Sequence, residues 1–231
     1  MREIAQARAS KAVRHEWYPV ADARSTILLF PTVRGISELE QRFATELNAK
    51  ARSVLLADLY GDRFTPERRD EAFKAMEAIK SDRAAMRELL QSVLATLREV
   101  DGVDETPVVA IGFCFGGQCA LDLARSGADI AGVASFHGLL DPPGLPPQPI
   151  RAKIIAFHGW DDPLAKPESV VTLGEELTVA GCDWQVHGFG GVGHGFTNPA
   201  ATGQMPGIEY DAAAARRSWA MFDLFLAEIE S

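Results

Sequence analysis

Cys114 stands in the stretch GFCFGG, with a glycine two residues before it and another two residues after it. The apolar run 107–113 predicts a buried strand and 115–126 predicts a helix, so the cysteine would occupy a tight strand-to-helix turn. The helix dipole there would favour a thiolate, and the N–H of Phe115 could donate to an oxyanion. The alternative is an inert buried cysteine lying between glycines, because free cysteines are often buried.

A nucleophilic thiol needs a base and a group that orients the base. His194 lies in the glycine-rich stretch GGVGHGF, where a histidine has little packing reason to occur. Asp161 and Asp162 follow the predicted strand 153–157 in FHGWDDP. The residues alone leave both carboxylates open, and adjacent carboxylates on a turn are often only solvated or capping groups. Of the other histidines, His15 and His187 lie in predicted strands, where we expect structural or exposed positions. His137 and His158 lie at strand ends, where either could line a pocket, but neither lies in a comparable glycine-rich loop.

The elements that must position these groups alternate between short apolar runs and longer amphipathic ones. Buried strands are predicted at 25–31, 53–58, 107–113, 130–136, 153–157 and 183–187. Helices are predicted at 39–47, 67–80, 82–98, 115–126, 168–180 and 210–229. This alternation indicates an α/β fold in which a mostly parallel, twisted sheet has helices on both faces. Sites in such sheets form at the carboxyl ends of the strands, where the candidate residues lie.

Composition restricts the classes of partner. The 231 residues carry a net charge of −9, which argues against nucleic acid and anionic membranes and disfavours anionic substrates outside a local basic pocket. No apolar run reaches the about 18 residues that span a bilayer, and the polar N-terminus does not resemble a signal peptide. We therefore expect a cytoplasmic, single-domain protein over 1–231, as a monomer or small homo-oligomer. Three cysteines in such a chain suggest neither a disulfide framework nor a zinc site.

The motifs GFCFGG, FHGWDDP and GVGHGF, supported by DLYGD at 58–62, resemble the dienelactone hydrolases, also called carboxymethylenebutenolidases. The order nucleophile, acid, base is that of α/β-hydrolases. The resemblance covers nearly the whole chain and implies an α/β-hydrolase fold without a large cap domain. It also implies a triad of Cys114, Asp162 and His194, with Asp162 rather than Asp161 as the acid. A second oxyanion donor is then expected at the N–H of Val33, beside that of Phe115.

Two positions depart from the family pattern as we align it. Thr32 stands where those enzymes carry a glutamate that helps to ionise the cysteine, and Asn198 stands where an arginine holds the substrate carboxylate. Dienelactone itself is therefore in doubt as a substrate, unless Arg34 or Arg83 compensates. We also expect four residues within or next to the motifs to line the pocket: Trp160, Phe196, Phe113 and Thr32. For the three aromatic residues, packing in the core is the alternative.

The predicted function is hydrolysis of carboxylic esters or lactones through a thioester acyl-enzyme. An apolar pocket would suit small-molecule substrates that are neutral, such as aryl or short acyl esters. The mechanism requires no metal and no organic cofactor, and no motif suggests one. One alternative is promiscuous hydrolysis of phosphotriesters by the same triad. Another is a non-hydrolytic protein of the same fold, which binds a ligand or senses redox state through Cys114.

Overall fold

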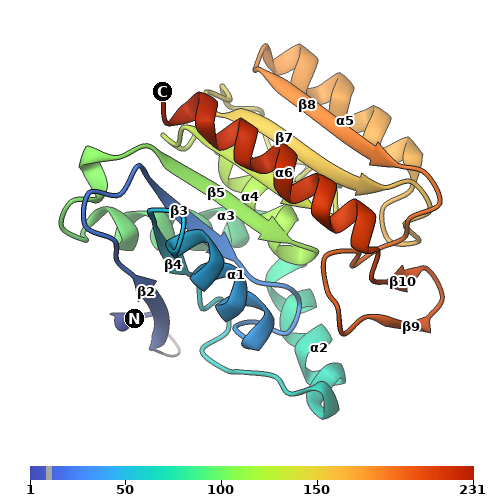
Figure 1. The fold of residues 1–231 in the computed structure, drawn as a ribbon, viewed down its shortest axis with the longest axis horizontal. Helices are drawn as coiled ribbons and strands as arrows, with labels where there is room; N and C mark the ends of the chain where they lie inside the picture. The colour runs from blue at the N-terminus through green and yellow to red at the C-terminus, as the bar shows by residue number, and fades with distance from the viewer. Residues whose placement is uncertain (9–11) are drawn as a thin grey trace.

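In the computed structural model, which describes residues 1–8 and 12–231, the chain forms an eight-stranded sheet with helices on both faces (Figure 1). The strand order is β1-β2-β4-β3-β5-β6-β7-β8. The strands are β1 (Arg2–Gln6), β2 (Val13–Tyr18), β3 (Ser25–Phe30), β4 (Arg52–Leu56), β5 (Val108–Phe113), β6 (Gly132–Phe136), β7 (Lys153–Gly159) and β8 (Trp184–Phe189). The predicted α/β architecture is confirmed.

Strands β3 to β8 are parallel, whereas β1 and β2 form an antiparallel hairpin that continues antiparallel onto β4. Apart from the strand position expected for His15, which lies in β2, this hairpin is not among the predicted strands. Its outer strand, β1, has the polar sequence of an exposed edge rather than a buried apolar run. A second small sheet, also not predicted, pairs β9 (Thr202–Met205) with β10 (Ile208–Glu209).

Two groups of helices cover the sheet. The helices are α1 (Glu38–Asn48), α2 (Arg69–Lys80), α3 (Arg83–Arg98), α4 (Phe115–Arg125), α5 (Pro167–Ala180) and α6 (Ala212–Ile229). Figure 1 shows α1 and α6 in front of the sheet and α3 and α4 behind it. Phe43 of α1 and Phe222 of α6 belong to one buried apolar cluster, and Leu90 of α3 and Leu173 of α5 belong to the other. The sheet is therefore buried on both faces, as parallel sheets require.

Local signals explain where several helices begin. Asp82 caps α3 by accepting the N–H groups of Ala84 and Ala85, and Ser37 caps α1 in the predicted capping box with Glu40. The helix predicted from residue 67 begins at Arg69 instead, because Pro66–Arg68 forms a 3₁₀ turn. These differences are confined to element ends.

The strand register brings the ends of three strands together. Phe30 of β3 pairs with Gly112 of β5, and Phe113 of β5 pairs with Phe136 of β6. The residues that follow these strands therefore leave the sheet side by side at its carboxyl edge. This edge receives Cys114 after β5, Val33 after β3 and His137 after β6.

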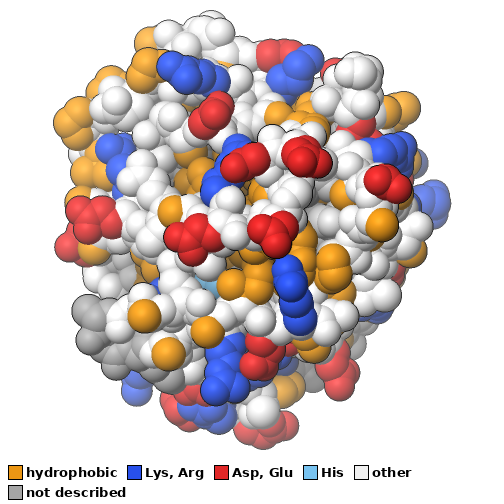
Figure 2. Space-filling view, turned by 90° about the vertical axis from the view of Figure 1, so that its left-hand side faces the viewer, with side chains coloured by type: hydrophobic (Ala, Val, Ile, Leu, Met, Phe, Trp, Pro, Cys, Tyr) orange, Lys and Arg blue, Asp and Glu red, His pale blue; other side chains and the backbone are white. Residues whose placement is uncertain are grey.

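The surface carries charges of both signs. On the face in Figure 2, acidic and basic side chains are intermixed with small apolar areas. No helix within residues 1–8 and 12–231 has the length and apolar character needed to cross a lipid bilayer.

Candidate active site

The turn between β5 and α4 is as tight as the sequence predicts. Cys114 has φ 56° and ψ −120°, a left-handed conformation that is strained for a residue with a side chain. A Cβ on Gly112 would lie 2.0 Å from the carbonyl oxygen of Gly116, and a Cβ on Gly116 would lie 2.3 Å from that of Phe30. Both positions therefore require glycine. The turn places Cys114 at the start of α4, at the positive end of the helix dipole.

The structure brings Asp162 and His194 into contact. Nδ1 of His194 lies 2.7 Å from Oδ2 of Asp162, and both side chains are buried. The other carboxylate oxygen of Asp162 accepts the backbone N–H groups of Leu164 at 2.8 Å and Ala165 at 3.2 Å. Asp161 is exposed instead. Of the two carboxylates that the sequence leaves open, Asp162 is thus the one that can orient the imidazole.

The loop that carries His194 is held by the small β9–β10 sheet. The N–H of His194 donates to the carbonyl of Gly207 at 2.7 Å, and its carbonyl accepts the N–H of Glu209 at 3.1 Å. A Cβ on Gly193 would lie 2.1 Å from the Gly207 oxygen, which explains why glycine precedes the histidine. The loop is therefore held in place by the β9–β10 strand pair, which the sequence pattern does not predict.

Charge coupling favours an ion pair between the thiol and the imidazole. Burial alone would raise the pKa of Cys114, but the charge of His194 and the N–H groups of Phe115 and Val33 outweigh it and lower this pKa. Burial alone would lower the pKa of His194, but Cys114 and Asp162 raise it to about 10. A side-chain hydrogen bond between His194 and Cys114 contributes to both shifts, so the imidazole can exchange a proton with the sulfur. The N–H groups of Phe115 and Val33, both predicted as oxyanion donors, therefore hydrogen-bond the Cys114 sulfur.

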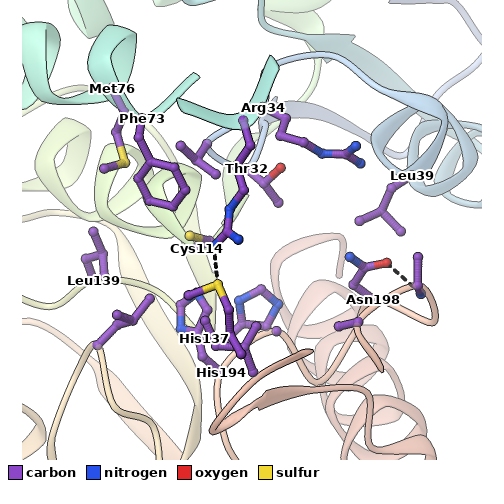
Figure 3. A pocket seen from close by; sticks show the side chains of 18 of the residues that line it. Thr32, Arg34, Leu39, Phe73, Met76, Cys114, His137, Leu139, His194 and Asn198 are labelled. Atoms are coloured by element: carbon purple, nitrogen blue, oxygen red, sulfur yellow. Dashed lines mark hydrogen bonds between the residues drawn. The ribbon is translucent and has the colours of Figure 1, made fainter. Parts of the chain in front are cut away.

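A cavity of about 540 Å³ opens above Cys114 and His194. In Figure 3, Thr32 and Arg34 approach it from the loop after β3, Phe73 and Met76 from α2, and Asn198 from the opposite side. The charged residues among its lining are Arg34, Arg69, Glu77 and Lys80. Besides the Cys114–His194 pair, the lining combines uncharged and apolar side chains with charged residues on helix α2 and on the loop after β3.

Of the four residues predicted to line the pocket, Thr32 lines the cavity and the three aromatic residues lie elsewhere. Phe113 and Phe196 are fully buried in the core, where Phe113 stacks on Phe43 with ring centroids 4.5 Å apart. Their side chains leave the backbone on the core side, away from the cavity. Trp160 is 44 % exposed and borders a separate surface groove between β8 and α5. The pocket prediction was wrong for these three residues.

The two arginines considered as carboxylate partners have different environments. Arg83 is engaged away from the cavity, because its guanidinium donates to Asp122 at 2.6 and 2.9 Å. Arg34 lines the cavity, and its guanidinium forms no hydrogen bond or salt bridge with a described residue. Arg34 therefore remains available to a ligand, and Arg83 does not.

His137 lies in the site, although sequence analysis indicates only that it could line a pocket. It follows β6 with φ 38°, lines the cavity, and packs edge-on against His194 with ring centroids 4.9 Å apart. Its Nε2 lies 2.8 Å from the Thr197 hydroxyl. Burial and the neighbouring His194 charge hold its pKa well below the usual value, so the ring is neutral. The sequence signal was a histidine at a strand end. Phe73 and Met76 had no such signal, since their place depends on how α2 docks.

All three cysteines are free thiols. Within the described part of the chain, no group of three or more His, Cys, Asp or Glu side chains is arranged to hold a metal ion.

Comparison with known proteins gives concordant results. The profile described as the dienelactone hydrolase family matches residues 17–229. The solved structure named m3DLH is 32% identical, with a TM-score of 0.89 over 100% of this chain and 98% of that one. A dienelactone hydrolase-like promiscuous phosphotriesterase from metagenomic libraries is 30% identical, with a TM-score of 0.87 over 99% and 97% of the two chains. An uncharacterised Caenorhabditis elegans protein is 38% identical over 143 residues, which are 60% of this chain and 90% of that protein.

Proposed function

Because this chain belongs to the dienelactone hydrolase family and is an ester hydrolase, we propose that it cleaves carboxylic esters or lactones through a thioester on Cys114. The observation that carries this proposal is the convergence on one sulfur of His194 and two backbone N–H groups. His194 is in turn oriented by the buried Asp162 carboxylate.

The first half-reaction forms the acyl-enzyme. The Cys114 thiolate attacks the ester carbonyl, and the N–H groups of Phe115 and Val33 hold the oxyanion of the tetrahedral intermediate. When the intermediate collapses, the bond to the leaving oxygen breaks and the His194 imidazolium gives that oxygen its proton. The product is an alcohol, or the free hydroxyl end of an opened lactone, and the acyl group remains on sulfur.

The second half-reaction regenerates the thiolate. Neutral His194 takes a proton from water, and the hydroxide attacks the thioester carbonyl within the same oxyanion hole. The C–S bond then breaks, the carboxylic acid leaves, and the imidazolium again faces a thiolate. Asp162 keeps the proton on Nδ1 of His194 throughout, so that Nε2 faces the reaction. The two half-reactions together consume only the ester and one water molecule.

Cavity chemistry limits the substrate. The apolar side chains of the lining, among them Phe73, Met76 and Leu139, suit an aryl or short acyl group. Asn198 offers an amide rather than a cation at its wall, which leaves dienelactone in doubt as the substrate. A negatively charged substituent would have to reach the cations at Arg34, Arg69 or Lys80.

Turnover of p-nitrophenyl acetate before and after treatment with iodoacetamide tests the proposal, together with mass mapping of the alkylated residue. We expect steady turnover that falls in step with alkylation of Cys114. Cys182 is an internal comparison, because burial raises the pKa of its thiol and should make it react more slowly. A Cys182→Ala variant should keep full activity. Steady turnover that survives complete alkylation of Cys114 would refute the triad.

Phosphotriester hydrolysis is a second candidate, supported by the similarity to the promiscuous phosphotriesterase. The same two N–H donors would stabilise the phosphoryl oxygen as Cys114 displaces an aryloxide. Water must then cleave the phosphoryl–sulfur bond for turnover to continue. Steady release of p-nitrophenol from a p-nitrophenyl dialkyl phosphate supports catalysis, whereas a burst of one equivalent per enzyme indicates inhibition.

A further inference from the structure

Glu40 is a buried carboxylate that the mechanism above does not use. It lies on the first turn of α1 and has 0 % exposed surface. Oε1 accepts the Thr32 N–H at 3.1 Å and the Thr32 hydroxyl at 2.8 Å. Oε2 accepts the Ser37 N–H at 3.1 Å and the Ser37 hydroxyl. A single side chain thus binds both ends of the segment 32–37.

This segment, which we call the oxyanion loop, carries the N–H of Val33. The loop is a tight turn, in which the N–H of Gly35 donates to the Thr32 carbonyl at 3.0 Å and Gly35 has φ 73°. The Tyr60 ring packs against the loop, because a Cβ on Gly35 would lie 3.0 Å from that ring. Val33 is the residue directly after Thr32, so the two bonds from Thr32 to Glu40 fix the start of the peptide that presents the donor.

Helix capping accounts for only half of these contacts. A capping box needs the Glu40 side chain to reach the Ser37 N–H, and the Ser37 side chain to accept from the start of the helix. Neither bond involves Thr32. The two bonds to Thr32 cross eight residue positions backwards to the end of β3, and they use the oxygen that a cap leaves free.

We propose that Glu40 is a positioning residue for catalysis, which holds the Val33 N–H in the oxyanion hole through Thr32. The proposal rests on the proposed function, since the oxyanion is that of ester cleavage. Glu40 does not touch substrate. It acts by keeping the donor aimed at the place where charge develops, and a displaced donor is weaker because its hydrogen bond depends on direction.

The expected effect follows from the value of one donor. Removing an oxyanion-hole donor costs about 10²- to 10³-fold in kcat. Glu40→Gln keeps the shape of the side chain but replaces one of the two accepting oxygens by an NH₂ group, so it loosens the Val33 donor without deleting it. We expect kcat for p-nitrophenyl acetate to fall about 10- to 100-fold with KM within about twofold, because the donor acts mainly on the transition state.

A second readout does not depend on turnover. The Val33 N–H also helps to lower the pKa of the Cys114 thiol. The pH profile of iodoacetamide alkylation at Cys114 should therefore move to higher pH in Glu40→Gln. The alkylation profile distinguishes failure of the Glu40 proposal from failure of the proposed function. Absence of ester turnover in the wild-type enzyme would refute the proposed function. The shift of the alkylation profile in Glu40→Gln would still test whether Glu40 positions the Val33 N–H.

Glu230→Gln is the matched control. Glu230 is also a buried glutamate with several hydrogen bonds, from the Ser25 hydroxyl at 2.7 Å and the Arg52 guanidinium at 2.7 and 3.1 Å. It lies beside the start of β3, at the opposite edge of the sheet from Cys114. The control should lower Tm but leave kcat and the alkylation profile unchanged.

Thr32 provides a second test if Glu40→Gln folds poorly. Thr32→Val removes the hydroxyl bond to Glu40 and leaves the capping box intact, whereas Thr32→Ser keeps that bond. We expect Thr32→Val to lower kcat and Thr32→Ser to restore it. Two results would show that Glu40 serves only as a helix cap. In the first, Glu40→Gln lowers Tm as Glu230→Gln does, while kcat and the alkylation profile stay at wild-type values. In the second, Thr32→Val retains the wild-type kcat.

Discussion

Replacing Asp162 by asparagine should reverse the tautomer of His194. Oδ1 of Asp162 accepts two backbone N–H groups, from Leu164 and Ala165, while Oδ2 faces Nδ1 of His194 at 2.7 Å. Asparagine has one oxygen, and the two buried N–H groups will claim it because an unsatisfied buried donor is costly. The NH₂ group must then face Nδ1. Nδ1 becomes an acceptor, the proton moves to Nε2, and the neutral ring can no longer take a proton at Nε2.

The magnitude has two sources. The substitution removes a buried charge that helps to raise the pKa of His194, and it imposes the wrong tautomer. The same change in a serine protease triad costs about 10⁴-fold in kcat. A thiolate needs less help from a base than a serine hydroxyl does. We therefore expect a loss of about 10³-fold, or about 4 kcal/mol of barrier.

The measurement is kcat/KM for p-nitrophenyl acetate, with Tm recorded to verify folding. Asp161→Asn is the neighbouring control: Asp161 is exposed, so this variant should retain wild-type activity. A folded Asp162→Asn enzyme that keeps more than a tenth of the wild-type kcat/KM would show that the carboxylate does not orient the base.

Three further outcomes follow from the same geometry. kcat/KM should rise with pH as the Cys114 thiol ionises, at a pH below the usual range for a thiol, and should fall near pH 10, where His194 loses its proton. A bell-shaped pH profile of kcat/KM centred below pH 6 would contradict the ion pair. In Cys114→Ala the thiolate is gone while burial remains, so an NMR titration should show the pKa of His194 falling well below 10, and an unchanged value would exclude the coupling. Gly116→Ala should abolish activity or folding, since its Cβ would meet the carbonyl oxygens of Phe30 and Pro31 at 2.3 and 2.5 Å; a fully active variant would exclude a rigid turn.

The sequence predicted the elements whose signals are local. The apolar run 25–31 and the stripe of α3 are strong periodic patterns, and their boundaries were right to within two residues. The turn at Cys114 could be predicted because backbone crowding requires glycine at 112 and 116. Chain order also brings the turn with Asp161 and Asp162 near His194, since all three residues come after parallel strands that end at one edge, but only the structure shows that Asp162 makes the contact.

What the sequence could not provide depends on tertiary packing. Phe113 directly precedes Cys114 in the sequence, yet its side chain faces α1 and α6 while Cys114 turns towards the cavity. Phe196 is two residues from His194 and is likewise buried in the core. Phe73 and Met76 are 41 and 38 positions before Cys114 and line the cavity because α2 docks across its mouth. Sequence proximity to a motif is therefore a poor guide to the pocket.

The charge of the whole chain also says little about the charge that a substrate meets. The net charge of −9 disfavours anionic ligands only if the acidic groups lie near the site. At physiological ionic strength a charge is screened over about 8 Å, so the potential in the cavity depends on its own lining. That lining holds three cations, Arg34, Arg69 and Lys80, against one carboxylate, Glu77. Arg34 forms no salt bridge with a described residue, although it interacts electrostatically with the exposed Glu67, so the loop that carries the proposed oxyanion donor also carries a cation that a ligand can reach. Lys80 is paired with Asp141 at 3.5 Å, so Arg34 and Arg69 are the lining cations that a negatively charged substituent of the ester would meet, whatever the sign of the charge on the remote surface.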